Sequence, residues 1–416
     1  MLLLLAQRPD ADRSALPLTS NTSLPAFTSA NPARTLVPVF IYFLAAGIAT
    51  VMLGPLLPAL IQHWHIQDAQ AGTLFTADFA GQFIGAWFAT RNLRASVLYG
   101  SALTAAGCVA MTLVGFGLAH LALFAIGIGL GAGLTAGNVI AGTVVPSARA
   151  RLIAMLNVAW GLSAIACPVL VRSAGGVPRF FLITATLLAI TSLVAIAIPR
   201  TTPSTNPTPV PRPESLTQPA TQSRLPLPPL PLFVFGTAIF LYMGVENSLG
   251  GWLPSYAVRT SATLHASSIA VYFWTAELTG RILITALMTL LGEALLYRLC
   301  LALLILTQIL LCATTHISAT GIVVLTILGA LSLAPLYPLI VSFILARTGN
   351  HARLGSLFAT ASLGGATLPW LTGVVSTHFQ GLRAGLLVPA TGAALLLFLS
   401  AIITGKPTQP ANTCAP

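Results

Sequence analysis

Long apolar stretches separated by short polar segments run along most of this chain of 416 residues. Each stretch has about 20 residues or slightly more, the length that a helix needs to cross the hydrocarbon core of a bilayer. The pattern predicts an all-α membrane protein with twelve transmembrane helices. The predicted spans are 36–62, 71–90, 94–117, 119–145, 150–173, 176–198, 231–257, 267–291, 293–315, 318–346, 354–377 and 383–404.

Three polar segments divide the chain. Residues 1–35 are expected to form a disordered cytoplasmic tail, since the opening MLLLLA is shorter than the apolar core of a signal peptide. Residues 199–230 are rich in Pro, Thr and Ser and predict a semi-rigid cytoplasmic linker, either a spacer or a ligand for an SH3-type domain. With a cytoplasmic tail at 405–416, six-helix bundles remain at 36–198 and 231–404.

Composition excludes a soluble protein. Hydrophobic residues make up 56% of the chain and charged residues only 6%, whereas a soluble domain has about 25% charged residues. The net charge of +11 would suit nucleic acid, but the basic residues are scattered singly and form no stripe. We expect the lipid bilayer and a small-molecule solute as partners, no nucleic acid, and a monomer.

The positions of lysine and arginine predict the orientation. With a cytoplasmic N-terminus, fourteen of the 19 basic residues lie on the cytoplasmic side, four in outer loops and one, Arg281, inside a span. Because basic residues favour cytoplasmic loops, both termini and the linker are predicted to be cytoplasmic. The expected location is the inner or plasma membrane of the cell, as a multi-pass protein.

The two halves of the chain resemble each other. Residues 43–56 (FLAAGIATVMLGPL) align with 240–253 (FLYMGVENSLGGWL) at an offset of 197, and 76–82 (TADFAGQ) align with 275–281 (TAELTGR) at an offset of 199. A third match follows in spans 5 and 11. Matches in the same order at a nearly constant offset indicate a duplicated six-helix unit, and transporters built this way bind their solute between the halves.

On these segments the chain resembles the major facilitator superfamily and, more narrowly, its fucose permease-like branch of sugar:proton symporters. The narrower resemblance is carried by YMGVENSLGGWL, FWTAELTGR, LSLAPLYPLI and LGGATLPWLTG in spans 7, 8, 10 and 11. It implies solute binding between two halves that rock against each other. Two acidic positions of fucose permease are occupied here by Gly54 and Leu134, so neither its proton route nor fucose itself is carried over.

Four ionisable residues fall near the middle of the predicted spans, where such residues usually mark a pathway, and all four are candidates for proton coupling or gating. Glu277 and Arg281 can pair on one helix face, as a structural salt bridge or as a gate. Asp78 could pair with Arg281 or carry a proton, since burial disfavours the charged form. Glu246 has no cation within a helical turn. We expect it to bind a proton or to accept hydrogen bonds from the solute.

Amides and aromatic rings near Glu246 complete a candidate sugar site, because amides bind hydroxyl groups and flat rings cover the apolar face of a sugar. Gly250, Gly251 and Pro254 predict a helix that is broken beside this site. Each amide or ring could instead serve helix packing or anchor the chain at the membrane interface. The predicted solute-binding residues are Glu246, Asn247, Tyr242, Asn138, Asn157, Trp160, Gln82 and Trp274.

Other patterns predict no further chemistry. The glycine-rich run at 127–137 lies inside a span and follows no strand, which indicates helix packing rather than nucleotide binding. The single lysine, Lys406, lies near the C-terminus, so no Walker motif is present. His63 and His65 lack further metal ligands, and the five cysteines show no metal or redox spacing. We predict no cofactor, no metal site and no enzymatic activity.

The sequence therefore predicts a secondary active transporter of a small polar solute, with a sugar as the solute and H⁺ as the coupling ion. A proton-coupled exporter of drugs or metabolites is the alternative within transport, and an apolar cavity in which Glu246 binds a cation would favour it. A solute sensor that does not translocate is the alternative of another class. The direction of transport and the choice between H⁺ and Na⁺ stay open.

Overall fold

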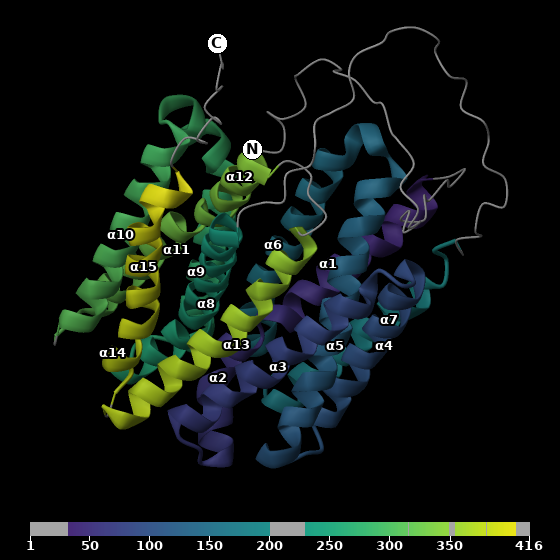
Figure 1. Ribbon diagram of the computed structural model, residues 1–416. Helices are drawn as coiled ribbons and strands as arrows, with labels where there is room; N and C mark the ends of the chain where they lie inside the picture. The colour runs from purple at the N-terminus through teal and green to yellow at the C-terminus, as the bar shows by residue number, and fades with distance from the viewer. Residues whose placement is uncertain (1–31, 200–228, 315, 349–353, 380, 405–416) are drawn as a thin grey trace, which may run out of the picture.

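The chain is helical throughout the part that the structure describes. Within this part it forms fifteen α-helices. Both predicted tails, apart from the residues that begin the first helix, and most of the predicted linker lie outside the described residues. The computed structural model describes residues 32–199, 229–314, 316–348, 354–379 and 381–404 (Figure 1).

The first half contains seven α-helices and a short 3₁₀ helix, and the second half contains eight α-helices. The elements of the first half are α1 (Pro32–Val51), α2 (Leu53–Trp64), α3 (Asp68–Ala89), α4 (Leu93–Met111), α5 (Phe116–Val144), η2 (Pro146–Ala148), α6 (Arg149–Ser173) and α7 (Val177–Ala195). Those of the second half are α8 (Pro229–Thr260), α9 (Ala266–Leu290), α10 (Glu293–Ala313), α11 (Ala319–Leu333), α12 (Leu336–Thr348), α13 (Leu354–His378), α14 (Leu382–Gly385) and α15 (Leu387–Ile403).

The fifteen helices make twelve spans, because three spans are each built from two helices. α1 and α2 form span 1, α11 and α12 form span 10, and α14 and α15 form span 12. A proline lies in or just after each break: Pro55, Pro335 and Pro389. Proline has no N–H to donate and its ring clashes with the preceding turn, which favours a break at these positions. The predicted all-α fold of twelve transmembrane helices is confirmed.

The break predicted in span 7 is absent, so that prediction is wrong. α8 runs without interruption from Pro229 to Thr260 and includes both glycines and the proline. The glycines serve close packing instead. A Cβ added at Gly251 would lie 2.6 Å from the ring of Phe75 on α3, and one added at Gly54 on α2 would lie 2.3 Å from the carbonyl oxygen of Gly250. The broken helix lies across the interface, in span 1.

The two halves meet mainly along three helix pairs. In Figure 1 the first half runs from purple through blue to teal and the second from teal to yellow, and the main contacts between them join α3 to α13, α6 to α9 and α2 to α8. In span numbers these pairs are 2 with 11, 5 with 8 and 1 with 7. Each span of one half has an equivalent span in the other half. When the equivalents are exchanged, the pair of spans 2 and 11 becomes the pair 8 and 5, and the pair of spans 1 and 7 stays the same. Two halves related by an axis along the membrane normal have this arrangement.

Apolar character varies among the spans in a way that follows this interface. By length and composition, nine helical segments of the described residues are apolar enough to cross a membrane. The spans formed by α3, α9 and α13 are less apolar than these nine. All three pack against the opposite half, so neighbouring helices surround their polar residues and reduce contact with lipid.

The glycine-rich run at 127–137 lies in α5 and packs α5 against α3, as predicted. A Cβ added at Gly127 would lie 1.9 Å from the carbonyl oxygen of Asp78, and one added at Gly131 would lie 2.1 Å from that of Gln82. Small residues at such contacts let two backbones approach closely in a membrane. The run therefore fixes the α3 backbone at two of its polar residues, Asp78 and Gln82.

Candidate functional site

Three ionisable side chains from α8 and α9 form a buried group, which we call the acid–arginine cluster: Glu246, Glu277 and Arg281. One guanidinium nitrogen of Arg281, Nη2, donates to Oε1 of Glu246 at 2.7 Å and to Oε1 of Glu277 at 2.5 Å. The two glutamate side chains are 7% and 2% exposed. The Glu277–Arg281 pair that the spacing predicts is therefore present, with Glu246 as a third member.

Glu246 has a cationic partner in the structure, although no cation lies within a helical turn of it in the sequence. Its partner Arg281 lies 35 residues further along the chain, on the neighbouring helix, where the spacing within one helix gives no sign of it. Oε1 of Glu246 is consequently already occupied by a charged donor. Two carboxylates around one guanidinium leave the cluster with one negative charge in excess unless one carboxylate carries a proton.

Asp78 on α3 is bound differently. Its Oδ2 accepts a hydrogen bond from Nε2 of Gln82 at 3.0 Å, one turn further along α3. Its Oδ1 is buried and has no hydrogen-bond partner in the described part of the chain, so the predicted pairing with Arg281 is not present in this state. The repeat aligns Asp78 with Glu277 and Gln82 with Arg281. The first half thus keeps the acid and replaces its cation by a neutral amide.

Aromatic rings connect the acid–arginine cluster to the first half. The guanidinium carbon of Arg281 lies 5.6 Å from the ring centre of Trp160 on α6, within the range of a cation–π interaction. Trp160 in turn meets Trp274 of α9 edge to face, with ring centres 5.8 Å apart. In the second half, Tyr242 is fully buried beside Tyr337 of α12 at 5.4 Å. The structure therefore places the predicted Glu246 and Trp160 against Arg281, and Trp274 against Trp160.

The predicted asparagines are not gathered in this way. Nδ2 of Asn138, Asn157 and Asn247 donates to the carbonyl four residues earlier in the same helix, at 3.0, 3.0 and 2.8 Å. These bonds orient each amide on its own helix and do not join helices. Asn157 is exposed, whereas Asn247 lines a cavity between the halves.

This small space, which we call the central cavity, has a volume of about 10 Å³. Such a volume is close to the smallest that holds one water molecule. Glycines allow its walls to approach, since Gly54 leaves no room for a Cβ against α8. A larger side chain at the Gly54 position would not fit in this state. The lining residues are Thr50, Val51, Leu53, Gly54, Phe75, Asp78 and Phe79 from the first half and Asn247, Gly250, Gly251 and Trp274 from the second.

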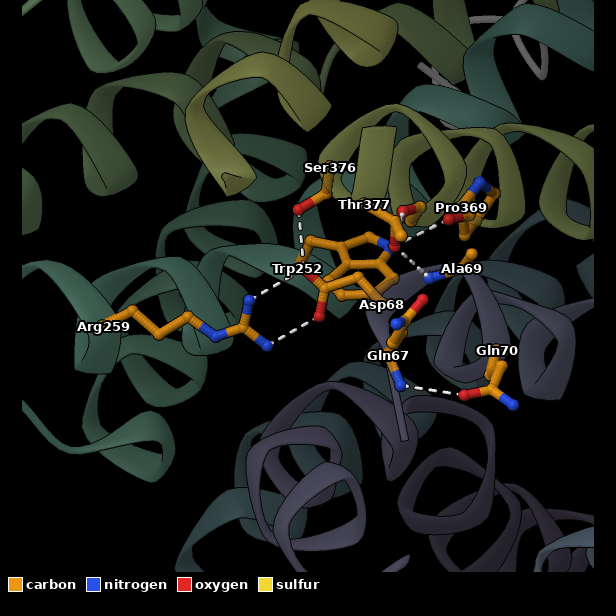
Figure 2. Close-up of polar contacts among 10 residues, drawn as sticks. Gln67, Asp68, Ala69, Gln70, Trp252, Arg259, Pro369, Ser376 and Thr377 are labelled. Atoms are coloured by element: carbon orange, nitrogen blue, oxygen red, sulfur yellow. Dashed lines mark hydrogen bonds and ion pairs between the residues drawn. The ribbon is translucent and has the colours of Figure 1, made fainter. Parts of the chain in front are cut away.

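A second polar site joins the halves where α3 begins and where α8 and α13 end, and we call its residues Asp68, Arg259 and Ser376 the gate (Figure 2). Arg259 donates to Asp68 twice, from Nη2 to Oδ1 at 2.7 Å and from Nη1 to Oδ2 at 2.8 Å. The Ser376 hydroxyl donates to Oδ2 of Asp68 at 2.6 Å. The side chain of Asp68 is 10% exposed and that of Arg259 is 41% exposed.

Backbone contacts extend the gate along α3 and α13. The Ala69 N–H donates to Oγ1 of Thr377 at 2.8 Å, as Figure 2 shows, and Oγ1 of Thr76 donates to the Ala366 carbonyl at 2.9 Å. A Cβ added at Gly373 would lie 2.3 Å from the carbonyl oxygen of Asp68. The two halves are therefore closely joined at this end of the bundle.

The gate is not among the residues predicted from the sequence. A signal was available, because the chain has only eight acidic residues, and Asp68 lies at the predicted outer end of a span. Arg259 lies at the same predicted depth in the other half. What the sequence does not give is the pairing, because 191 residues separate the two side chains.

An open hollow of about 1230 Å³ borders the gate. Its wall includes Asp68 and Arg259 as well as His316, Ser318 and Arg383 from the second half. The hollow does not reach the acid–arginine cluster, since none of the three cluster residues lines it. The gate therefore forms part of the wall of this larger space.

Metal ligands do not cluster in the described residues. No group of three or more His, Cys, Asp or Glu side chains lies close enough there to hold a metal ion. His63 lies in α2, and His65 follows this helix in the left-handed conformation, with φ of 51°. Four cysteines are described and all are free thiols, and Cys414 lies outside the described residues.

Known proteins share both sequence and fold with this chain. The family model described as Major Facilitator Superfamily matches residues 39–362. Bypass of stop codon protein 6 from Saccharomyces cerevisiae is 24% identical over 279 residues, which cover 59% of this chain and 55% of the yeast protein. The chain thus spans about half the length of this curated relative.

Solved structures of transporters have the same arrangement of helices. A bacterial homolog of the human lysosomal transporter Spinster, in an inward-facing and occupied conformation, is 15% identical with a TM-score of 0.71, covering 90% of this chain and 98% of that chain. A D-xylose-proton symporter is 15% identical (TM-score 0.67, 88% and 96% covered), and FucP in the outward conformation is 18% identical (TM-score 0.59, 89% and 99% covered). At these identities the likeness establishes the fold alone.

Proposed function

The chain belongs to the Major Facilitator Superfamily, and from this premise we propose that it is a secondary active transporter that moves a small polar solute, a sugar, together with protons. The family and the fold make it a multi-pass membrane transporter. The solute, the coupling ion and the roles of individual residues are the proposal.

The acid–arginine cluster is the observation that carries proton coupling. Its two carboxylates and one guanidinium have a net charge of −1 when fully ionised, and an uncompensated charge inside a membrane costs several kcal/mol. Uptake of one proton by the two glutamates removes that cost. Because both acids share Nη2 of Arg281, the proton belongs to the pair rather than to one residue.

Arg281 provides a route from the proton to the opposite half. When both glutamates are ionised they hold the guanidinium strongly, and protonation of either one weakens that hold. The same guanidinium lies over Trp160 of α6, in the contact between α6 and α9. We expect protonation to alter this contact and so to change the relative stability of the two orientations of the halves.

The surroundings of the cluster favour a neutral polyhydroxylated solute over a cation. Trp160 and Trp274 offer flat rings between the halves, and Asn247 and Asp78 offer polar groups beside them. Glu246, the residue on which a cation exporter would rely, is already paired with Arg281. No described contact thus supports the exporter over the symporter.

The proposed orientation places both termini and the linker in the cytoplasm of a cell with the chain in its inner or plasma membrane. It follows from the fourteen basic residues on that side against four on the other. In this orientation the gate faces outside, and its closure describes a state that is shut toward the exterior. The proposed transporter works as an importer and as a monomer.

Solute-driven proton movement in proteoliposomes tests the proposal. D-glucose, D-xylose and L-fucose would be compared with tetraphenylphosphonium, for the wild type, Glu246→Gln and the control Glu293→Gln, which changes a glutamate at the start of α10. We expect a sugar to move protons with it in the wild type and the control. In Glu246→Gln we expect sugar exchange without net proton movement.

Two other outcomes would contradict the proposal. If tetraphenylphosphonium moves protons in the opposite direction and no sugar does so, the protein is an exporter. If a sugar binds to the purified protein but shows no counterflow in vesicles, the protein is a sensor. Equal proton movement in the wild type and Glu246→Gln would remove Glu246 from the coupling mechanism.

A further inference from the structure

The central cavity has an unsatisfied acceptor and an unsatisfied donor in the residues of its wall. Oδ1 of Asp78 and Nε1 of Trp274 are both buried, and neither has a hydrogen-bond partner in the described part of the chain. Asp78 is 2% exposed and Trp274 is 5% exposed. Buried polar atoms in folded proteins nearly always have a partner, so these two call for a group that is brought in from outside the chain.

The position of the cavity points to the same conclusion. Residues of its first-half wall are repeat equivalents of residues of its second-half wall: Thr50 aligns with Asn247, Leu53 with Gly250, Gly54 with Gly251 and Phe75 with Trp274. A space lined by equivalent positions lies on the axis that relates the halves. It is the place that either half can expose when the halves rock.

We propose that the central cavity is the contracted solute site, and that Asp78 and Trp274 bind the two sides of one solute hydroxyl group. The Asp78 carboxylate accepts the hydroxyl hydrogen, and the Trp274 indole N–H donates to the hydroxyl oxygen. A hydroxyl group donates one hydrogen and also accepts at its oxygen. It therefore supplies the donor that Oδ1 of Asp78 lacks and the acceptor that Nε1 of Trp274 lacks. This inference rests on the proposed transport of a neutral polyhydroxylated solute.

Other small occupants fit the wall less well. A metal ion or an ammonium group would be attracted to Asp78 but would meet the positive N–H of Trp274. An anion would accept from Trp274 but would be repelled by Asp78. A hydroxyl satisfies both atoms, and a cavity of about 10 Å³ has room for a group the size of one water molecule. The rest of the solute requires the halves to separate.

The repeat then gives two equivalent acids two different roles. Glu277 lies beside Arg281 and shares it with Glu246, which suits the holding of a proton. Asp78 lies beside the neutral Gln82 and keeps one oxygen free, which suits the binding of a hydroxyl. The neighbour one turn away thus distinguishes the two acids. It is an amide beside Asp78, the proposed solute ligand, and a guanidinium beside Glu277, the proposed proton carrier.

Binding of sugars and their monodeoxy analogues tests the assignment. Isothermal titration calorimetry on purified full-length protein would use D-glucose, D-xylose, L-fucose and the monodeoxy derivatives of each. In the wild type we expect loss of one particular hydroxyl to weaken binding about tenfold or more, since it bonds a charged group. Asp78→Asn should weaken binding of the parent sugar about tenfold, and Trp274→Phe about threefold to tenfold.

The sensitive hydroxyl should matter less once one of its two partners is gone. In either variant the loss of affinity caused by the missing hydroxyl is expected to be smaller than in the wild type, as non-additivity between contacting groups requires. Trp87→Phe is the control, because Trp87 lies on the same helix as Asp78 and is 65% exposed. A thermal melt of each variant identifies any that fail to fold, and Asp78→Glu then replaces Asp78→Asn.

Failure of this inference can be told apart from failure of the proposed function. If sugars bind and move protons but every deoxy sugar loses the same factor in the variants as in the wild type, the subsite is wrong and the function stands. If Asp78→Asn stops proton movement without changing sugar affinity, Asp78 belongs to the proton route and the subsite is again wrong. If the wild type neither binds a sugar nor moves protons with one, both proposals are wrong.

Discussion

In the proposed orientation the gate should hold the exterior end shut, and its ion pair sets how strongly. Asp68 lies on α3 in the first half, while Arg259 and Ser376 lie on α8 and α13 in the second. Separation of the halves at this end therefore breaks the pair and both of its hydrogen bonds. Arg259→Gln and Asp68→Asn remove the charge attraction with little change of shape, so both should populate the state that is open to the exterior.

The size of the effect follows from the exposure of the pair. Exposed ion pairs contribute about 0.2–1 kcal/mol, and hydrogen bonds to charged groups about 1.5–3 kcal/mol. Asp68 is nearly buried and Arg259 is 41% exposed, which places this pair between the two ranges, at about 1–2 kcal/mol. Since 1.4 kcal/mol changes an equilibrium tenfold, the ratio of open to closed molecules should rise about 5- to 30-fold.

Double electron–electron resonance measures this ratio directly. Spin labels carried by unnatural amino acids at Gln70 and Phe379, which are exposed on opposite halves, leave the native cysteines in place. We expect a longer-distance population to grow in Arg259→Gln and Asp68→Asn. The control Arg179→Gln, which changes an exposed arginine at the same predicted side, should resemble the wild type.

The charge-reversed double variant separates the ion pair from other effects of the two substitutions. Asp68→Arg combined with Arg259→Asp restores opposite charges and should return part of the closed population. If both single variants give the wild-type distance distribution, the pair does not hold the gate. If they open the gate and the reversed pair opens it equally, the loss of other contacts such as the Ser376 hydrogen bond is responsible.

Two further substitutions test the packing and the charge balance of the interface. Arg281→Gln leaves two buried carboxylates without a cation and should lower the free energy of unfolding by about 3–5 kcal/mol, measured by thermal melting in detergent; adding Glu277→Gln should restore part of the loss, and no restoration would contradict the charge explanation. Gly54→Ala places a Cβ 2.3 Å from the Gly250 carbonyl oxygen and should destabilise the protein by about 1–3 kcal/mol. Gly117→Ala is the control and should not destabilise the protein, since no atom lies within 4 Å of its added Cβ. Equal melting temperatures of the two variants would show that α2 can shift away from α8 without cost.

Properties that depend on one helix at a time can be predicted from the sequence. The twelve spans follow from runs of apolar residues, and the Glu277–Arg281 contact follows from the geometry of a single helix. The packing role of the glycine-rich run follows from its place inside a span. In each case the residues that decide the outcome are close together in the chain.

Properties that depend on two helices are the ones that the sequence did not settle. Glu246 binds Arg281 because α8 lies beside α9, and Asp68 binds Arg259 because the start of α3 comes close to the end of α8. The amides of Asn138 and Asn157 each donate to a carbonyl of their own helix, and their predicted contact with the solute stays a prediction. The repeat predicts which residues of the two halves are equivalent, but it does not predict the hydrogen-bond or ion-pair partner of each residue.

The positions of the two proposed sites explain how solute and proton could depend on each other. Trp274 belongs to the wall of the central cavity and contacts Trp160, and Trp160 lies under the guanidinium that holds Glu246 and Glu277. A hydroxyl bound to Trp274 fixes that ring, and the ring fixes Trp160 against Arg281. Protonation of the glutamates acts on the same guanidinium from the other side. Both events therefore act on the contact between α6 and α9. Because this contact must break when the halves rock, the solute and the proton can both shift the equilibrium between the two orientations of the halves.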